Sequence, residues 1–219
     1  QRSMPYRTWN DKFDFIDTRE RMREQRAAFL ELKLRNSLYH FHTLYASYLK
    51  TSVADTVNFL NPNYLNTGTT KQDYAFLRYD YRYDKRDNKQ YSLKGEVVVI
   101  QAIKYGLLPK DDVNQLSFSA IYQNFFPIKG KFYGDISLST KVSFPKLQSY
   151  ILTQGLGYSN QLIRGYELYV IDGQDYLLGK TNLKYELLNK VLDLKKVIRV
   201  KQFNTMPISA YATTYLDAG

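Results

Sequence analysis

Apolar and polar side chains alternate along much of the chain, and this period of two is typical of β-strands with two different faces. The clearest stretch is residues 131–144. One face reads Phe132, Gly134, Ile136, Leu138, Thr140, Val142 and Phe144, and the other reads Tyr133, Asp135, Ser137, Ser139, Lys141 and Ser143. Residues 75–84 and 176–187 alternate in the same way. The pattern predicts an all-β protein.

About eight strands are predicted from these runs, at residues 27–34, 38–50, 73–84, 96–105, 115–124, 132–144, 176–187 and 208–217. The connections between these strands alternate between short polar turns (35–37, around 87–88, 128–130) and long loops (51–72, 145–175). The connection at 189–207 breaks the alternation of short and long, because it is long where a short turn is expected. Residues 1–26 are charged and only weakly helical in pattern, so a polar loop segment with room for a helical turn is expected before a strand-rich domain at 27–219.

Two classes of β-protein fit strands with these faces. In a soluble sandwich the apolar face is the core and the polar face meets water. In an outer-membrane barrel the apolar face meets lipid and the charged face lines a wet lumen. The predicted strand lengths favour the barrel, since a tilted transmembrane strand needs roughly 9–11 residues and soluble strands cluster nearer 5–6. We therefore predict an antiparallel transmembrane β-barrel with its short turns on the periplasmic side.

Composition agrees with this prediction. The chain has 21 Tyr residues, whose amphipathic rings suit a boundary between apolar and aqueous layers. It has no Cys, which excludes disulfides, redox CxxC sites and thiolate metal sites. The net charge of +10 comes from basic residues interleaved with acids rather than from a dense basic tract. This pattern argues against nucleic-acid binding and suits a barrel rim facing lipid phosphates.

The long predicted loop 145–175 contains a recognisable motif, Ile163-Arg164-Gly165-Tyr166. It resembles, position for position, the (V/I)-R-G-(F/Y) signature in the sixth extracellular loop of the BamA family of outer-membrane assembly factors and two-partner secretion transporters. This family is also described as BamA/TamA-like bacterial surface antigens.

Three further features follow the order of that family over residues 38–219. Asp87-Asn88, with the stretch that ends at Gly95, resembles its D-N-x…(F/Y)-P-x-x-G turn, with Ser92 where Pro is usual. Residues 125–132 resemble the short turn before the strand that leads into the loop. The terminal stretch 215–219 resembles a late D-x-G strand motif.

The resemblance implies a sixteen-stranded barrel whose sixth loop folds back into the lumen. The eight strands would be about the sixth to the thirteenth, so we expect the chain to be a fragment of a longer protein. Arg164 would pair with Asp217 on the barrel wall in a water-poor site, Gly165 would allow a tight turn, and Tyr166 would pack at the loop tip.

The family often has a second acid on the strand after the loop. Lys184 occupies the matching position here, and Glu186, two residues further along the same face, is expected to substitute for that acid. This departure concerns the local charge network rather than the resemblance as a whole.

Catalytic and metal-binding signals are weak. His40 and His42 share a strand face but have no evident third ligand, which favours a structural role over a metal site. Gly155-x-Gly157 lacks the third glycine of a dinucleotide motif. No cofactor, metal or enzymatic activity is therefore predicted.

The resemblance implies an assembly, insertion or translocation factor of the bacterial outer membrane. Its partners would be outer-membrane lipids, unfolded outer-membrane or secreted polypeptides, and periplasmic or lipoprotein subunits, with no nucleic acid. A two-partner-secretion polypeptide transporter, a general channel, the barrel portion of a hydrolase fusion and a soluble Tyr-rich β-domain that binds surface ligands remain alternatives.

Overall fold

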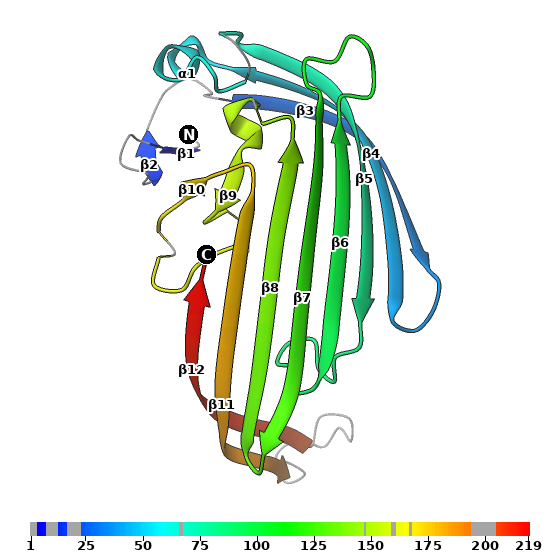
Figure 1. Ribbon diagram of the computed structural model, residues 1–219, viewed down its shortest axis with the longest axis vertical. Helices are drawn as coiled ribbons and strands as arrows, with labels where there is room; N and C mark the ends of the chain where they lie inside the picture. Colours follow the sequence, from blue (N-terminus) through cyan, green and yellow to red (C-terminus); the bar gives the residue numbers. More distant parts are fainter. Residues whose placement is uncertain are drawn as a thin grey trace.

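One antiparallel sheet of eight strands dominates the computed structural model (Figure 1). The structure describes residues 4–7, 13–16, 23–65, 68–146, 148–158, 161–166, 168–193 and 205–219. The sheet has the order β12-β11-β8-β7-β6-β5-β4-β3. Its strands are β3 (Arg23–Arg35), β4 (His40–Val53), β5 (Lys71–Asp84), β6 (Gly95–Tyr105), β7 (Gln115–Lys129), β8 (Phe132–Phe144), β11 (Tyr176–Asp193) and β12 (Thr205–Ala218).

Each of the eight predicted strands is present, and most are longer than predicted. The largest error concerns the predicted connection at 189–207, because its described residues, 189–193 and 205–207, are strand. Asn189–Asp193 continue β11 and pair with residues 205–209 of β12. The turn predicted at 128–130 also shifts, because β7 continues to Lys129 and a turn at Gly130 and Lys131 follows.

A polar loop was expected at residues 1–26, but the described residues in this range form strands. The short strands β1 (Met4–Arg7) and β2 (Phe13–Ile16) pair antiparallel, and β3 begins at Arg23. The boundary of a separate segment at residue 26 stays a prediction.

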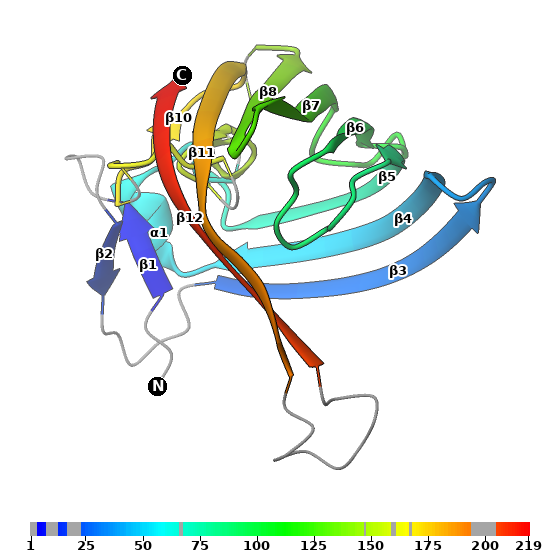
Figure 2. The same ribbon diagram turned by 90° about the horizontal axis from the view of Figure 1, so that it is seen from below.

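The sheet is strongly curved but not closed. Seen from below, it bends round an interior, with β11 and β12 on one side and β3 on the other (Figure 2). Among the described residues, no strand pairs with the outer edge of β3 or of β12. β11 and β12 extend beyond Phe132, where β8 begins, and continue there as a two-stranded ribbon (residues 187–193 and 205–210).

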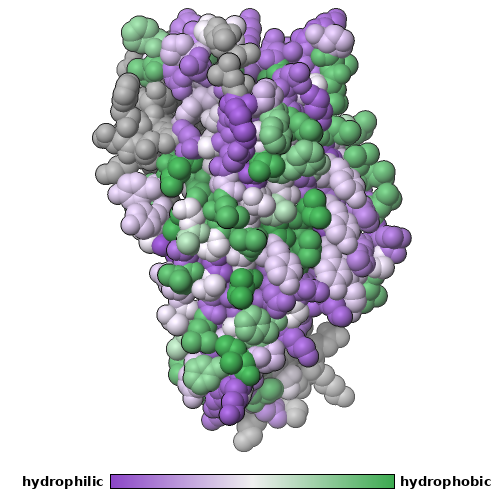
Figure 3. Space-filling view, in the orientation of Figure 1, coloured by the Kyte–Doolittle hydropathy of each residue, from purple (hydrophilic) through white to green (hydrophobic). Residues whose placement is uncertain are grey.

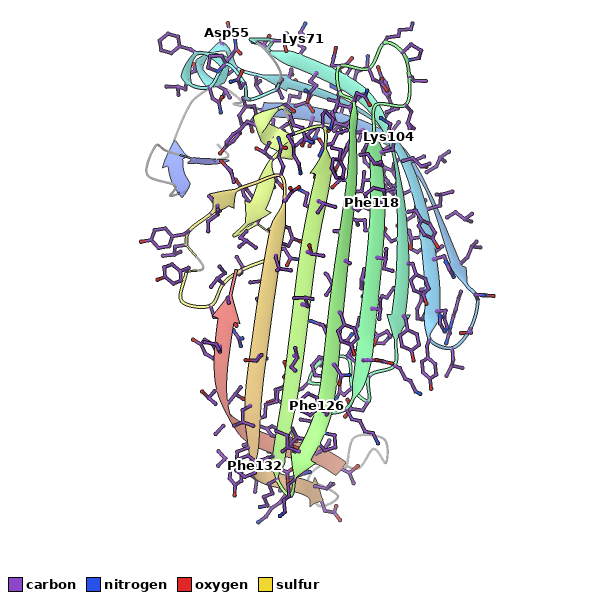
Figure 4. The ribbon with its side chains drawn as sticks, in the orientation of Figure 1. Asp55, Lys71, Lys104, Phe118, Phe126 and Phe132 are labelled. Carbon is purple, nitrogen blue, oxygen red and sulfur yellow. The ribbon has the colours of Figure 1, made fainter. Side chains whose placement is uncertain are left out.

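The two faces of the sheet have inverted polarity compared with a soluble sandwich. Many apolar side chains on the convex face are exposed, among them Phe118, Ile136, Leu138, Val142, Leu177 and Leu183. Figure 3 shows apolar side chains spread over this face, and Figure 4 labels Phe118 towards the upper end and Phe126 and Phe132 towards the lower end. The concave face buries polar side chains instead, among them Gln115, Ser117, Asp135, Ser139, Ser143 and Lys184.

Apolar packing is concentrated at the upper end of the molecule. Helix α1 (Asp55–Leu60) follows β4 and contributes Val57 to a cluster with Val53 and Leu65. Ile151, from the loop between β8 and β11, packs against this cluster, and its backbone N–H donates to the carbonyl of Tyr64 at 3.1 Å. The cluster therefore ties the two long upper connections together. In the described residues, no helix is long and apolar enough to cross a membrane.

Replacing Leu65 by Ala tests this cluster. Leu65 is 0% exposed, so Leu65→Ala should lower the free energy of unfolding by about 2–4 kcal/mol in urea titrations. The matched control is Leu60→Ala, whose side chain is exposed and whose cost should stay within about 1 kcal/mol. Equal costs for the two variants would contradict the assignment of this core.

Candidate functional site

The loop between β8 and β11 (residues 145–175, the β8–β11 loop) folds back against the concave face of the sheet. Its strands β9 (Gln154–Leu156) and β10 (Ile171–Asp172) pair antiparallel. Ser139 Oγ donates to Gln161 Oε1 at 3.0 Å, and Lys141 Nζ donates to the carbonyl of Gln154 at 2.9 Å. Polar side chains on the concave face of β8 thus hold the loop through hydrogen bonds.

Glycines let the loop strands approach each other closely. A Cβ at Gly155 would lie 2.6 Å from the carbonyl oxygen of Ile171, and Gly157 has a φ of +87°. Only glycine tolerates both requirements without strain. The Gly155-x-Gly157 pair is explained by this backbone geometry.

Arg164 occupies the centre of the site. Its Nε donates to Asp217 Oδ2 at 2.8 Å, its Nη2 donates to Asp217 Oδ1, and its backbone N–H donates to Asp217 Oδ2 at 3.0 Å. The guanidinium carbon also lies 4.1 Å from the ring centroid of Tyr215. The side chain of Asp217 is only 3% exposed, so this fork supplies the counter-charge that a buried carboxylate requires. The hydrogen bond to Asp217 raises the pKa of Arg164 above its ordinary value.

A chain of polar contacts leads from Arg164 across the sheet. Arg164 Nη1 donates to Asn182 Oδ1, and Asn182 Nδ2 donates to Asp135 Oδ1. Lys184 Nζ lies 2.8 Å from Asp135 Oδ2, an ion pair without the angles of a hydrogen bond, and donates to the carbonyl of Ser92 at 3.1 Å. The contacts thus join the β8–β11 loop to the connection between β5 and β6 (residues 85–94, the β5–β6 connection).

The strand register makes this chain possible. Asn182 of β11 lies directly opposite Asp135 of β8 and Tyr215 of β12. Lys180 lies opposite Asp217. Directly opposed positions on one face bring side chains within contact distance.

Glu186 lies away from Arg164. Its carboxylate accepts hydrogen bonds from Tyr133 Oη at 3.5 Å and from Asn189 Nδ2 at 3.4 Å. Arg164 is connected through Asn182 to Asp135 instead. Lys184, at the position where the family often has an acid, forms an ion pair with Asp135.

The β5–β6 connection is built around Asp87, Asn88 and Gly95. Asp87 Oδ1 accepts from the backbone N–H groups of Asn88 at 2.8 Å and Leu93 at 3.2 Å. Gly95 has a φ of +107°, and a Cβ there would overlap the carbonyl oxygen of Lys85. Ser92 donates from its Oγ to the carbonyl of Asn88. The connection is therefore a defined structure that presents the Ser92 carbonyl to Lys184.

Of the remaining motif residues, Gly165 and Tyr166 lie at the loop surface and Ile163 is half-buried. Gly165 has a φ of +90° with open space around it, as a tight turn requires. Tyr166 is exposed and its ring lies 6.0 Å from that of Tyr169. Ile163 is half-buried beside Leu156 and Gly219. Ser159, Asn160 and Glu167, in the same loop, lie outside the described residues.

The two histidines each bond a tyrosine of the neighbouring strand. His40 Nδ1 lies 2.8 Å from Tyr81 Oη, and His42 Nδ1 lies 2.8 Å from Tyr79 Oη. Within the described ranges, no group of three or more His, Cys, Asp or Glu side chains is arranged to hold a metal ion.

Three contributors were missed by sequence reasoning, namely Asp135, Asn182 and Tyr215. The alternating pattern placed Asp135 and Asn182 on polar faces, but it did not say which residues lie opposite each other. Their spatial convergence depends on register, which hydrophobic alternation leaves open along strands of this length.

The fold is similar to that of a solved structure. The crystal structure of BamA from Haemophilus ducreyi lacking POTRA domains 1–3 is similar with a TM-score of 0.57 and 12% sequence identity. The match covers 88% of this chain and 42% of that chain, so this chain spans less than half of its length. The likeness shows the fold, an antiparallel sheet of the outer-membrane barrel type. No protein-family model matches the chain, and no curated protein matches it.

Replacing Arg164 by Lys tests the fork to Asp217. Lys keeps the charge but loses the bidentate geometry, so chymotrypsin should cleave the loop after Tyr166 and Tyr169 about tenfold faster. Arg26→Lys is the control, because Arg26 is a highly exposed arginine on β3, and its cleavage pattern should match the wild type. An unchanged cleavage rate in Arg164→Lys would show that other contacts hold the loop.

Two glycine substitutions separate space from backbone strain. Gly95 and Gly165 both have positive φ, but only Gly95 is crowded. Gly95→Ala should therefore destabilise the protein by about 2–4 kcal/mol, and Gly165→Ala by only about 1 kcal/mol, in thermal or urea unfolding. A larger loss for Gly165→Ala would contradict the geometry of the β5–β6 connection.

Proposed function

We propose that this chain forms wall strands of an outer-membrane β-barrel that assembles, inserts or translocates polypeptides without covalent chemistry. The observation that carries the proposal is the anchoring of Arg164, from the R-G-Y motif, to Asp217 on the concave face. Such an anchor holds the β8–β11 loop within the barrel interior and ties it to β12.

The inverted polarity of the sheet supports the membrane part of the proposal. Exposed leucine, isoleucine and phenylalanine side chains along a convex face are costly in water and favourable in lipid. The strands of the sheet have 11 to 18 residues, which is enough for a tilted crossing of a hydrocarbon layer. Backbone groups at the edges of β3 and β12 would need further strand pairing in lipid.

The assembly part rests on the likeness to BamA in fold together with the loop motif. An interior loop bonded to a wall strand offers a mechanism, since it couples the filling of the lumen to the position of β12. Strand pairing templated at a weak seam, or opening of the lumen to a passing chain, would then follow from changes in these contacts. Unfolded polypeptides would be the substrates, with outer-membrane lipids and periplasmic or lipoprotein subunits as partners.

Fractionation of cells producing the full-length protein tests this proposal. The wild type should partition with the outer membrane and migrate faster on a gel when it is not heated. Arg164→Ala should unfold at a lower temperature and fail to complement a deletion strain, whereas Arg26→Ala should behave as wild type. A wild type that stays soluble without detergent would overturn the membrane assignment, and full complementation by Arg164→Ala would overturn the function of the anchor.

Replacing an outward leucine by Lys distinguishes lipid from water at the convex face. Leu138, in the middle of β8, is 46% exposed, so Leu138→Lys should be tolerated in water but should cost about 2–4 kcal/mol of folding free energy in a bilayer. Leu192→Lys is the matched control, because Leu192 is 42% exposed on the ribbon beyond the sheet. Refolding into vesicles measures both, and equal costs would contradict a lipid-facing β8.

A further inference from the structure

A small cavity of about 60 Å³ lies at the upper end of the sheet, where three segments of the chain meet (Figure 1). The start of β5 contributes Gln72, and the start of β7 contributes Gln115 together with Asp112 from the preceding connection. The beginning of the β8–β11 loop contributes Gln148 and Ser149. A water molecule needs about 10–15 Å³ of such space, so the cavity has room for an ion with a few waters.

Three oxygen atoms of these lining residues are buried without a hydrogen-bond partner in the described part of the chain. They are Gln115 Oε1, Gln148 Oε1 and Ser149 Oγ. Gln115 is 2% exposed and Ser149 is 7% exposed. Because buried polar groups in proteins are nearly always satisfied, three such oxygens around one cavity indicate a ligand that bonds to oxygen.

The local backbone does not use these oxygens. Ser149 is the N-cap residue of the 3₁₀ helix η1 (Tyr150–Leu152), yet its hydroxyl makes no capping hydrogen bond. The N–H of Leu152 donates to the backbone carbonyl of Ser149 instead, at 3.0 Å. Gln148 donates from Nε2 to the carbonyl of Pro145, which leaves its Oε1 as an acceptor.

The chemistry of the lining suits a cation. Asp112 is the one ionisable residue among the lining residues, and they include no Lys, Arg or His. Its Oδ2 already accepts the backbone N–H of Asp73 at 2.7 Å, and Asn114 Oδ1 already accepts from Lys104 Nζ. The three unpartnered oxygens are therefore the expected ligands.

We propose that this cavity binds Ca²⁺ through Gln115 Oε1, Gln148 Oε1 and Ser149 Oγ, with water completing the coordination. Ca²⁺ takes six to eight oxygen ligands in flexible geometry, among them side-chain amide carbonyls and waters. Mg²⁺ fits less well, since it requires a near-ideal octahedron and loses its waters reluctantly. A set of mainly neutral ligands implies weak binding, with a Kd of about 0.1–1 mM.

A bound ion would connect the beginning of the β8–β11 loop to β7, at the opposite end of that loop's path from Arg164. The site has at most one carboxylate, so it differs from a cluster of three or more acidic or histidine side chains. It is also independent of the proposed assembly function, because ion binding can be measured on the purified protein.

Calorimetric titration of the full chain in zwitterionic detergent with CaCl₂, after divalent ions have been removed with EDTA, tests the site. The double variant Gln115→Leu/Ser149→Ala should bind Ca²⁺ about tenfold or more weakly than wild type. It should remain folded without the ion, because the variant removes buried groups that lack a partner. The control is Gln123→Leu on the same strand, outside the cavity lining, and its affinity should stay within about twofold of wild type.

A gain of affinity separates a cation from trapped water. Gln148→Glu adds a carboxylate at a half-buried position, so it should bind Ca²⁺ about threefold or more tightly than wild type. Heat-modifiable migration confirms that each variant is folded. An absence of Ca²⁺ binding in the wild type would mean that the cavity holds water only and would overturn the site, as would equal binding by the double variant and the control. Displacement of Ca²⁺ by an equal concentration of MgCl₂ would overturn the assignment to Ca²⁺.

Discussion

The structure depends on one electrostatic constraint: a sheet that buries its polar face must compensate every charge that it buries. Asp217, Asp135 and Asp84 lie on that face, and each has a cationic partner, namely Arg164, Lys184 and the pair Arg82 and Arg86. An uncompensated charge at any of these positions would cost several kcal/mol. The fold of the β8–β11 loop and the β5–β6 connection follows from this need, because both connections deliver partners to the wall.

These partners come from segments far apart in the sequence. The loop brings Arg164 to the end of β12, and the β5–β6 connection brings the Ser92 carbonyl to Lys184. Tyr91 of the same connection stacks on Tyr211 of β12 with centroids 4.9 Å apart. The C-terminal end and the middle of β12 are therefore both held by connections that cross the concave face, so a change at either contact should affect the position of the strand.

The eight strands and the alternation of their faces could be predicted from the sequence, because neighbouring residues such as Asp135 and Ile136 differ in polarity and point to opposite faces of the sheet. The contact between Arg164 and Asp217 followed from the motif resemblance rather than from spacing. Asp135 and Asn182 could not be predicted as neighbours, since register is a property of two strands together. The extension of β11 was missed because a bulge between Glu186 and Leu188 interrupts the alternation.

That bulge shifts β11 by one residue, so that Leu188 and Leu192 take the side of the ribbon that Leu183 and Tyr185 occupy in the sheet. Glu186 still donates its N–H to the carbonyl of Lys131, but from Leu187 onward β11 has no neighbour on its β8 side within the described part of the chain. Amide groups without a neighbour need hydration. In a bilayer, the unpaired part of β11 would therefore have to lie in water. The hydrocarbon layer would have to end near Tyr185 and Phe132, whose ring centroids are 4.8 Å apart. The length of β8, rather than that of β11, would thus define the thickness of membrane that this wall can span.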